Sequence, residues 1–278
     1  MKVIFSRKGF DTTYGGFPSP IFPDGTIYSV PIPSKLNDKK FCELRFNYHG
    51  EPLQKILNQL TKKRIKARKL RECDYLQPKF RCHLDPFWIS KKLNYALGQV
   101  GAALKHLENN QIEKDDIFLF YGLFQEIENR NGEWCYIKSA PKIHLIFASM
   151  IVGEIIPVMR TTQKCPPFLG EHPHFDANFS KKYINKNVIF IGQKSHVFKY
   201  DIKRVLTDLK NYKGASKWRL PLDFDFSHAI TYISQVKVEK DEVVLQRQGP
   251  GQEYILNLNS LTSLQKTKFL RYLHQLLS

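Results

Sequence analysis

The stretch SRKGFDTTYGGFPSPIFPDG (residues 6–25) gathers reactive groups in a segment that is poor in helix and strand formers. Its carboxylate Asp11, within the glycine-rich part of the stretch, can act as a general base or orient a water molecule, and Arg7 and Lys8 can hold a phosphate. Its glycines permit close backbone approach, and its prolines stiffen the chain. The stretch therefore predicts either a rigid binding loop or a tight surface loop in which Asp11 caps its own turn. As a binding loop it would offer a substrate Arg7, Lys8, Gly9, Thr12, Thr13, Tyr14, Gly15 and Gly16.

The segment CHLDP (residues 82–86) brings together a thiol, an imidazole and a carboxylate. Asp85 before Pro86 is typical of a helix N-cap followed by proline at the first helical position. Alternatively, His83 and Asp85 lie in a cleft at the start of that helix, where backbone donors favour anions. Both interpretations predict a helix directly after Pro86.

Cys165, Glu171, His172 and His174 are of the types that bind metals, within the proline-broken segment 164–175. Their spacing matches no zinc pattern, so we predict no metal site, and His172 and His174 remain candidate catalytic residues. His144 is expected to be a buried core histidine. Walker, dinucleotide-binding, nucleophile-elbow and zinc-protease motifs are absent from the sequence, which therefore indicates no particular cofactor.

The chain is strongly basic, with a formal net charge of +17 over 278 residues. Such a charge favours a polyanionic partner, with nucleic acid first and an anionic membrane surface second. The run KKRIKARKLR (residues 62–71) is either a phosphate-binding patch or the solvated face of a helix, and it carries no sequence specificity. Its candidate nucleic-acid-binding residues are Lys62, Lys63, Arg64, Lys66, Arg68, Lys69 and Arg71.

Five cysteines without framework spacing favour a reducing cytoplasm over a disulfide scaffold. The N-terminus lacks the pattern of a signal peptide, and the longest apolar region (143–159) is too short and polar to span a bilayer. We therefore expect a cytoplasmic protein that is not embedded in a membrane.

The periodicity of apolar residues predicts an α+β fold with a mixed, largely antiparallel sheet or partly closed barrel and flanking helices. We expect a single domain over residues 1–278, or an N-terminal lobe (1–110) and a β-rich lobe (111–278) that share one core. Helices are predicted over 51–71, 94–110 and 260–277, the last with a Thr262–Gln265 capping box. Strands are predicted over 2–5, 26–33, 116–128, 134–139, 142–150, 152–159 and 187–192, with 218–226 irregular and a hairpin over 242–258.

The opening stretch SRKGFDTTYGGFPSPIFPDG (residues 6–25) is followed along the chain, in order, by HLDP, GQVGAALKHL, DIFLFYGLF, GEI, HPH, WRLP and GQEYIL. This ordered set resembles the nucleotide modification associated domain family, the third of the numbered families of that name, over residues 3 to about 258. The resemblance implies a setting of nucleic-acid base modification and phage–host conflict, with partner proteins of such a system. It implies roles for Arg7, Lys8, Gly9, Phe10, Asp11, Gly15, Gly16, His83, Asp85, Gln99, His106, His172, His174, Arg219, Gln252 and Glu253.

The chain departs from the expected pattern in two places. Thr12 and Thr13 stand where two serines are expected, which keeps both hydroxyls. The segment FASMIVGEI (147–155) replaces an expected Gly-Trp and removes an aromatic ring on which a base could stack.

Three functions fit these features. In the first, the protein is an enzyme acting on a base or nucleotide of DNA, with residues 6–17 and 83–86 converging on one pocket. In the second it is a non-catalytic reader of modified bases, since DIFLFYG followed by VGEI is similar to small barrels of the PUA-like class. In the third it is a basic structural subunit of a defence complex.

Overall fold

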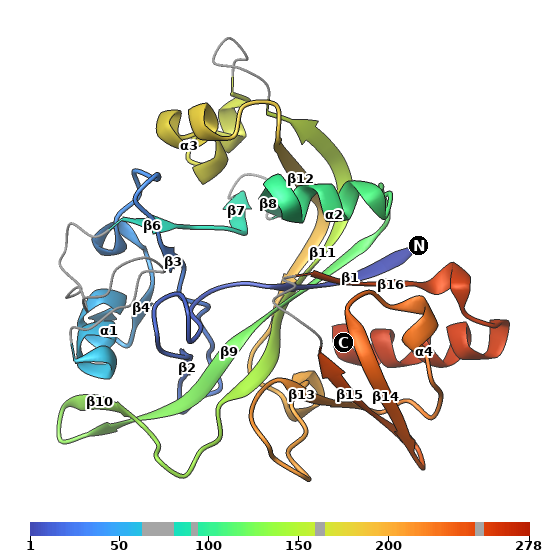
Figure 1. The fold of residues 1–278 in the computed structure, drawn as a ribbon. Coiled ribbons are helices and arrows are strands. Elements are labelled where there is room, and N and C mark those ends of the chain that lie inside the picture. Colours follow the sequence, from blue (N-terminus) through green and yellow to red (C-terminus); the bar gives the residue numbers. More distant parts are fainter. Residues whose placement is uncertain (63–80, 90–93, 159–164, 248–252) are drawn as a thin grey trace.

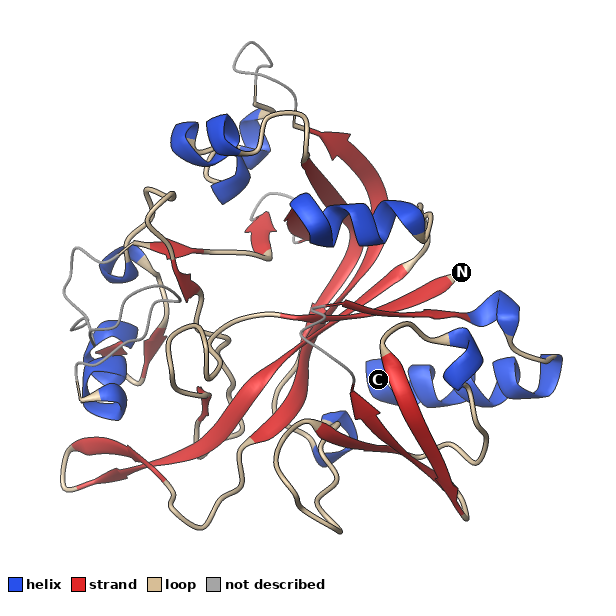
Figure 2. Ribbon diagram, in the orientation of Figure 1, coloured by secondary structure: helices blue, strands red, loops and turns tan. Residues whose placement is uncertain are grey.

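The computed structural model describes residues 1–62, 81–89, 94–158, 165–247 and 253–278. Its main feature is one curled sheet with helices placed around it (Figures 1 and 2). In spatial order the strands are β16 (Glu253–Asn257), β1 (Lys2–Arg7), β9 (Ile117–Arg130), β11 (Ile143–Pro157), β12 (Asn187–Val197), β8 (Asn94–Val100) and β7 (Phe87–Ile89). Strands β2 (Ser19–Ile21) and β10 (Glu133–Tyr136) also pair with β9.

The sheet is mixed, as predicted. Strands β1 and β2 run parallel to β9, whereas the other pairs in the sheet are antiparallel. The sheet curls so that the two ends of the strand order approach each other. The contact is direct, since the side chain of Gln99 on β8 donates a hydrogen bond to Glu253 on β16. The predicted α+β class with a partly closed, largely antiparallel sheet is confirmed.

Three smaller sheets and four α-helices complete the described part of the chain. The first small sheet consists of β13 (Lys217–Leu220), β15 (Glu242–Arg247) and β14 (Ile233–Glu239). The others pair β3 (Ile32–Pro33) with β6 (Cys82–His83), and β4 (Asn47–Tyr48) with β5 (Glu51–Pro52). The helices are α1 (Leu53–Thr61), α2 (Gly101–Asn109), α3 (Ala177–Lys182) and α4 (Ser263–Leu277).

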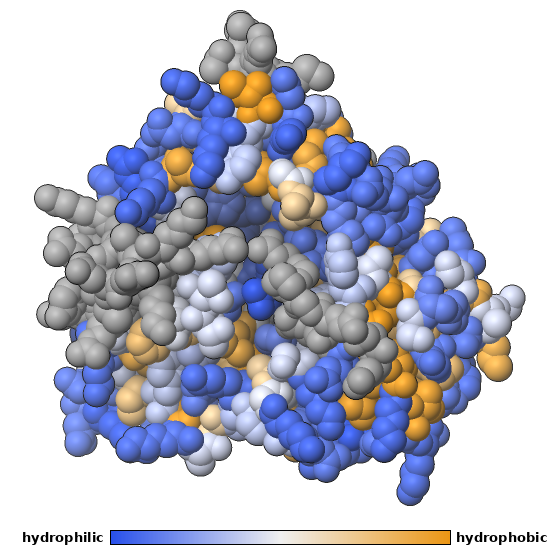
Figure 3. All heavy atoms as spheres, viewed as in Figure 1, coloured by the Kyte–Doolittle hydropathy of each residue, from blue (hydrophilic) through white to orange (hydrophobic). Residues whose placement is uncertain are grey.

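Strand β9 is apolar on both faces because both faces of the sheet are covered. Phe118 and Phe120 contribute to one buried cluster, while Leu119 and Tyr121 face a second cluster around Trp218. A continuous apolar run is what a strand buried on both sides requires, since successive side chains point to opposite faces. The surface in Figure 3 is mainly hydrophilic, in keeping with the charge of the chain.

The helix predicted over residues 94–110 is wrong in its first part. Asn94–Val100 form strand β8, which pairs antiparallel with β7 and β12, and helix α2 begins only at Gly101. A short apolar run fits a buried strand as well as one face of a helix, so periodicity alone does not separate them. Gly101 has φ +57°, a conformation that glycine adopts easily, and it makes the change from strand to helix.

The hairpin predicted over residues 242–258 is also wrong. Strand β15 pairs with β13 and β14, while β16 pairs with β1 in the main sheet. The glycine-proline signal between them lies outside the described residues. The helix predicted after Pro86 is wrong as well, because Phe87–Ile89 form β7.

Other predicted elements differ mainly in their bounds. Helix α1 buries Leu53, Ile56, Leu57 and Leu60, and it ends at Thr61 with Lys62 in the left-handed conformation. Of the strand predicted over 26–33, only Ile32–Pro33 is a strand. The segment 218–226, predicted to be irregular, lies partly in β13. The two strands predicted between 142 and 159 form the single, bulged strand β11.

The C-terminal helix α4 carries the predicted capping box. Thr262 accepts from the backbone nitrogen of Gln265 at 3.3 Å, and the Gln265 side chain accepts from the nitrogen of Thr262 at 3.0 Å. His144 is buried as predicted, and its Nδ1 accepts from Nε1 of Trp218 at 2.9 Å. None of the helices in the described ranges has the length and apolar character needed to cross a membrane.

Candidate functional site

A buried polar cluster lies where the ends of the strand order approach each other. Lys8, just after β1, lies 3.9 Å from Oε1 of Glu253 and 4.0 Å from Oδ2 of Asp85. The same Glu253 oxygen accepts from Nε2 of Gln99 at 2.7 Å and from the hydroxyl of Ser6 at 3.2 Å. One ammonium therefore lies between two carboxylates that are almost completely buried, with side chains 3% and 2% exposed.

Asp85 is the centre of this cluster. Its Oδ1 accepts from the backbone nitrogen of Gly98 at 2.9 Å and lies 3.7 Å from Nε2 of His172. Its Oδ2 lies 3.8 Å from Nε2 of His83. The β6 segment supplies His83, the loop that follows supplies Asp85, and the short helical turn Pro173–Phe175 and the residue before it supply the other histidines.

Packing fixes the His174 ring closely. Its Nδ1 lies 2.6 Å from Oδ1 of Asn187, and its ring packs 4.5 Å from Phe179 of α3. The ring also lies directly on the backbone of Gly98, where a Cβ atom would overlap it. His83 stacks on the same Phe179 at 5.0 Å, and its Nδ1 lies 2.8 Å from Oδ1 of Asn37.

Burial determines the charge of these groups. It lowers the pKa of His83 and of His172 well below the ordinary value, and it lowers that of His174 to about 3. Burial raises the pKa of Asp85 to about 6, although Lys8 and the Gly98 N–H act in the opposite direction. The three imidazoles are therefore neutral at pH 7.

Three of these residues form a set of metal-ligand type. His83, Asp85 and His174 each offer one ligand atom, and all three atoms lie within 4.8 Å of one another. Sequence spacing did not indicate this set, because its members come from segments that are far apart in the chain. Of the ligand types noted in segment 164–175, only His174 belongs to it.

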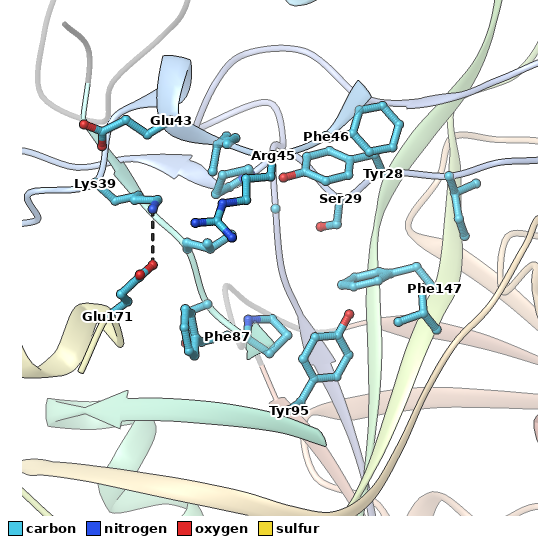
Figure 4. Close-up of a pocket in the computed structure, with 18 of the residues that line it drawn as sticks. Tyr28, Ser29, Lys39, Glu43, Arg45, Phe46, Phe87, Tyr95, Phe147 and Glu171 are labelled. Atoms are coloured by element: carbon cyan, nitrogen blue, oxygen red, sulfur yellow. Dashed lines mark hydrogen bonds and ion pairs between the residues drawn. The ribbon is translucent and has the colours of Figure 1, made fainter. Parts of the chain in front are cut away.

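A pocket of about 710 Å³ opens beside the cluster, and Asp85 is part of its wall. Its lining is mostly aromatic and apolar, and Figure 4 shows the rings of Tyr28, Phe46, Phe87, Tyr95 and Phe147 around it. Burial raises the pKa of Tyr28 and of Tyr95, which keeps both hydroxyls protonated. The cationic residues of the lining are Arg45, whose guanidinium is directed into this space in Figure 4, and Lys39, which pairs with Glu171 at 3.3 Å.

The profile of a known family matches residues 2–257 of the chain, and its description is Nucleotide modification associated domain 3. The chain belongs to this family. Membership links the protein to nucleotide or DNA modification. Comparison with curated proteins and with solved structures gave no significant match.

Some of the residues that carry the family resemblance meet in the buried cluster or at the pocket, and the others lie elsewhere. Those in the buried cluster or at the pocket are Lys8, Gly9, His83, Asp85, Gln99, His172, His174 and Glu253. They come from five of the ordered segments: the opening stretch, HLDP, GQVGAALKHL, HPH and GQEYIL, which are spread over most of the matched region.

The opening loop, residues 6–25, lies partly in the cluster and partly outside it. Oδ1 of Asp11 accepts from the backbone nitrogens of Thr13 and Tyr14 at 2.7 and 2.6 Å, and its Oδ2 pairs with Arg7 at 3.0 Å. Thr12 and Thr13 are exposed. Asp11 thus caps its own turn, while Lys8 and Gly9 of the same loop reach the cluster and the pocket.

Glycines allow this turn. Gly15 and Gly16 both have φ +83°, and a Cβ on Gly15 would overlap the ring of Phe10. The backbone nitrogen of Gly16 donates to the Asp11 carbonyl at 2.8 Å, which closes the turn.

Arg219 lies in the small sheet and pairs with three carboxylates, those of Asp208, Glu239 and Glu242. Its neighbours account for its charge without a ligand. His106 on α2 lies 4.6 Å from the Tyr232 ring. Gln252 and the basic residues Lys63, Arg64, Lys66, Arg68, Lys69 and Arg71 lie outside the described residues, and Lys62 is exposed at the end of α1.

The residues that surround the cluster carry little signal in the sequence. Asn37 and Asn187 orient two of the histidines, and the aromatic residues of the pocket come from separate segments. Asparagines and aromatic residues are common, and nothing in the spacing of these marked them. The usable signal was Gly98 within an apolar run, because glycine inside a strand often marks close approach by another group.

Proposed function

We propose that the protein is an enzyme that acts on a base or nucleotide of DNA, which it holds in the aromatic pocket beside Asp85. The observation that carries the proposal is the double position of Asp85, which lines the pocket and also belongs to the buried cluster. A ligand in the pocket would lie beside Asp85, whose carboxylate is 3% exposed and has surroundings that backbone and histidine contacts already fix. Preorganisation of this kind is typical of catalytic sites and is costly to maintain for packing alone.

The size and lining of the pocket suit a nucleobase with its sugar. About 710 Å³ is within the range of small-molecule sites. Enzymes that act on a base in DNA take it out of the helix and hold it between aromatic or apolar side chains. The rings around this pocket would provide such stacking, and Arg45 would meet a phosphate at its side.

The charge of the chain supports a nucleic-acid substrate. A formal net charge of +17 attracts phosphate backbones independently of sequence. Family membership points to the same class of substrate.

The test is nucleoside mass spectrometry after incubation of the protein with DNA, both modified phage DNA and unmodified DNA, in the presence of small molecules from a cell extract. We expect a released base or a mass shift with the wild type and its loss in Asp85→Asn. Asp241→Asn is the matched control, because Asp241 is exposed at the turn between β14 and β15. It should retain full activity.

The reader of modified bases is the alternative that this experiment separates. A reader would bind modified DNA more tightly than unmodified DNA and leave every nucleoside unchanged. Selective binding with no product from the wild type would overturn the enzyme proposal.

A further inference from the structure

Two imidazoles of the buried cluster, those of His83 and His174, each have one ring nitrogen beside an asparagine oxygen and offer a ligand atom within 4.8 Å of one from Asp85. Nδ1 of His83 lies 2.8 Å from Oδ1 of Asn37. The side-chain nitrogen of Asn37 donates to the carbonyl of Pro173 at 2.8 Å and to Asp176 at 2.9 Å, which fixes Oδ1 as an acceptor. Nδ1 of His83 must therefore carry the hydrogen. In the neutral ring this leaves Nε2 with a lone pair, 3.8 Å from Oδ2 of Asp85.

His174 is held in the same way. Its Nδ1 lies 2.6 Å from Oδ1 of Asn187, whose side-chain nitrogen donates to the His174 carbonyl at 3.1 Å. Oδ1 of Asn187 is again the acceptor, so Nδ1 of His174 carries the hydrogen and Nε2 the lone pair. Metal-binding histidines commonly donate their second ring N–H to such an oxygen, which fixes both tautomer and orientation.

His172 has the opposite tautomer. Its Nδ1 accepts from the backbone nitrogen of His174 at 3.2 Å, so its hydrogen is on Nε2. That nitrogen is buried, has no hydrogen bond of regular geometry within the described structure, and lies 3.7 Å from Oδ1 of Asp85, while the backbone of Ala96 is also close to the ring. A small movement of either group would let it donate to Asp85, so its place is beside the ligand set and not in it.

Three acceptor atoms thus converge without hydrogens between them. Their mutual repulsion in a buried site is costly unless a cation lies among them. Lys8 supplies one positive charge, but it lies between Asp85 and Glu253 at similar distances from both. Its ammonium is therefore shared between two carboxylates, and no described side chain places a positive charge among the three ligand atoms themselves.

We propose that His83, Asp85 and His174 bind one divalent first-row transition-metal ion, and that His172 orients Asp85. Two imidazole nitrogens and one carboxylate oxygen are a ligand set that zinc and iron(II) accept. Metal–ligand bonds of about 2.0–2.2 Å place ligand atoms roughly 3–3.5 Å apart. The 3.8 Å between Nε2 of His83 and Oδ2 of Asp85 needs little adjustment, whereas the pairs with His174, which lie within 4.8 Å, must close further when an ion binds. Three protein ligands leave coordination positions for water or substrate, and Asp85 lines the pocket.

This inference goes beyond the proposed function and does not depend on it, because metal binding is measured without activity. The full chain, free of any affinity tag, is stripped with a chelator, loaded with Zn²⁺, Mn²⁺ or Co²⁺, or with Fe²⁺ without oxygen, then desalted and analysed for metal. We expect about one ion per chain for at least one of these metals. His83→Ala and His174→Ala should lower this content at least tenfold.

His196→Ala is the matched control, since His196 is an exposed histidine on β12, and it should load like the wild type. X-ray absorption of the loaded wild type needs no variant, so it decides even if the alanine variants misfold. It should show nitrogen and oxygen ligands with an imidazole signature. Sulfur ligation would point to a cysteine site and overturn the proposal.

The role of His172 has its own test. His172→Leu should weaken metal affinity about 10-fold to 100-fold, and His172→Gln, whose amide nitrogen replaces Nε2, should recover most of it. Equal affinity in wild type and His172→Leu would refute the orienting role. A wild type that retains less than about a tenth of an ion for every metal, or alanine variants that load normally, would refute the site itself.

Discussion

Replacement of Gly98 by alanine tests whether the backbone of β8 holds the histidine cluster in place. A Cβ at this position would overlap Cδ2, Nε2 and Cε1 of the His174 ring. The ring has little freedom to move, because Nδ1 is bonded to Asn187 and the ring packs on Phe179. The nitrogen of Gly98 also donates to Asp85 at 2.9 Å, so a shift of the strand would disturb two members of the cluster together.

Overpacking of a buried site costs about 1–3 kcal/mol. In a chain of this size each kcal/mol lowers Tm by about 2–4 °C, so we expect a fall of roughly 2–12 °C. Metal content and base-modifying activity should fall further than stability does, because the new methyl group lies against the nitrogen that would hold the ion. Thermal melting, metal analysis and nucleoside mass spectrometry measure the three effects.

Gly170→Ala is the control for stability. Gly170 has φ −57°, and a Cβ there would lie 3.5 Å from the carbonyl of Pro167, an ordinary contact. It should leave stability unchanged or raise it by about 0.4–1 kcal/mol. If Gly98→Ala melted like the wild type and bound metal equally well, His174 would not pack on Gly98 as described, and the argument for a fixed cluster would fail.

Two further predictions concern regions outside the cluster. Arg219→Gln should destabilise the protein by about 3 kcal/mol, because it leaves Asp208 buried without its main partner. The hydrogen bond from Arg219 lowers the pKa of Asp208 to about 2, so this stabilisation is present above pH 4 and is lost as pH falls toward 2. Melting curves of the wild type should therefore fall more steeply than those of Arg219→Gln between pH 4 and pH 2, and parallel curves would contradict this assignment. Thr262→Ala should cost about 1 kcal/mol in denaturant titrations by removing the cap of α4, whereas Thr262→Ser, which keeps the hydroxyl, should cost much less; equal losses in both variants would show that the hydroxyl is not the cause.

The sequence predicted the type of sheet and many of the residues that meet in the cluster, for different reasons. Strands such as β9 and β11 are long apolar runs whose length and composition leave few alternatives. His83, Asp85, His172 and His174 stand out as chemically reactive side chains within two short segments that contain prolines. Both patterns are local in the sequence, so they can be recognised without knowledge of the fold.

What the sequence did not predict depends on contacts between distant segments. His174 lies about ninety residues after His83 and Asp85 in the chain, and only the fold brings its ring next to them. The sequence predicts a helix where β8 lies, because its apolar run fits either element and its longer pairing partner, β12, comes about ninety residues later. The metal-ligand set was missed for the same reason, since no single segment contains more than two of its members.

The geometry indicates that the opening loop has a positioning role. Its Asp11 bonds its own turn and Arg7, which fixes the path of the chain directly after β1. On that path the nitrogen of Lys8 donates to the carbonyl of Tyr121 at 2.8 Å, and a Cβ on Gly122 would come within 2.8 Å of the Lys8 carbonyl. Backbone contact this close holds Lys8 at a fixed position between the two buried carboxylates. The loop therefore matters to the proposed site chiefly by placing the Lys8 ammonium between Asp85 and Glu253, and the polar groups of its turn serve to hold that placement.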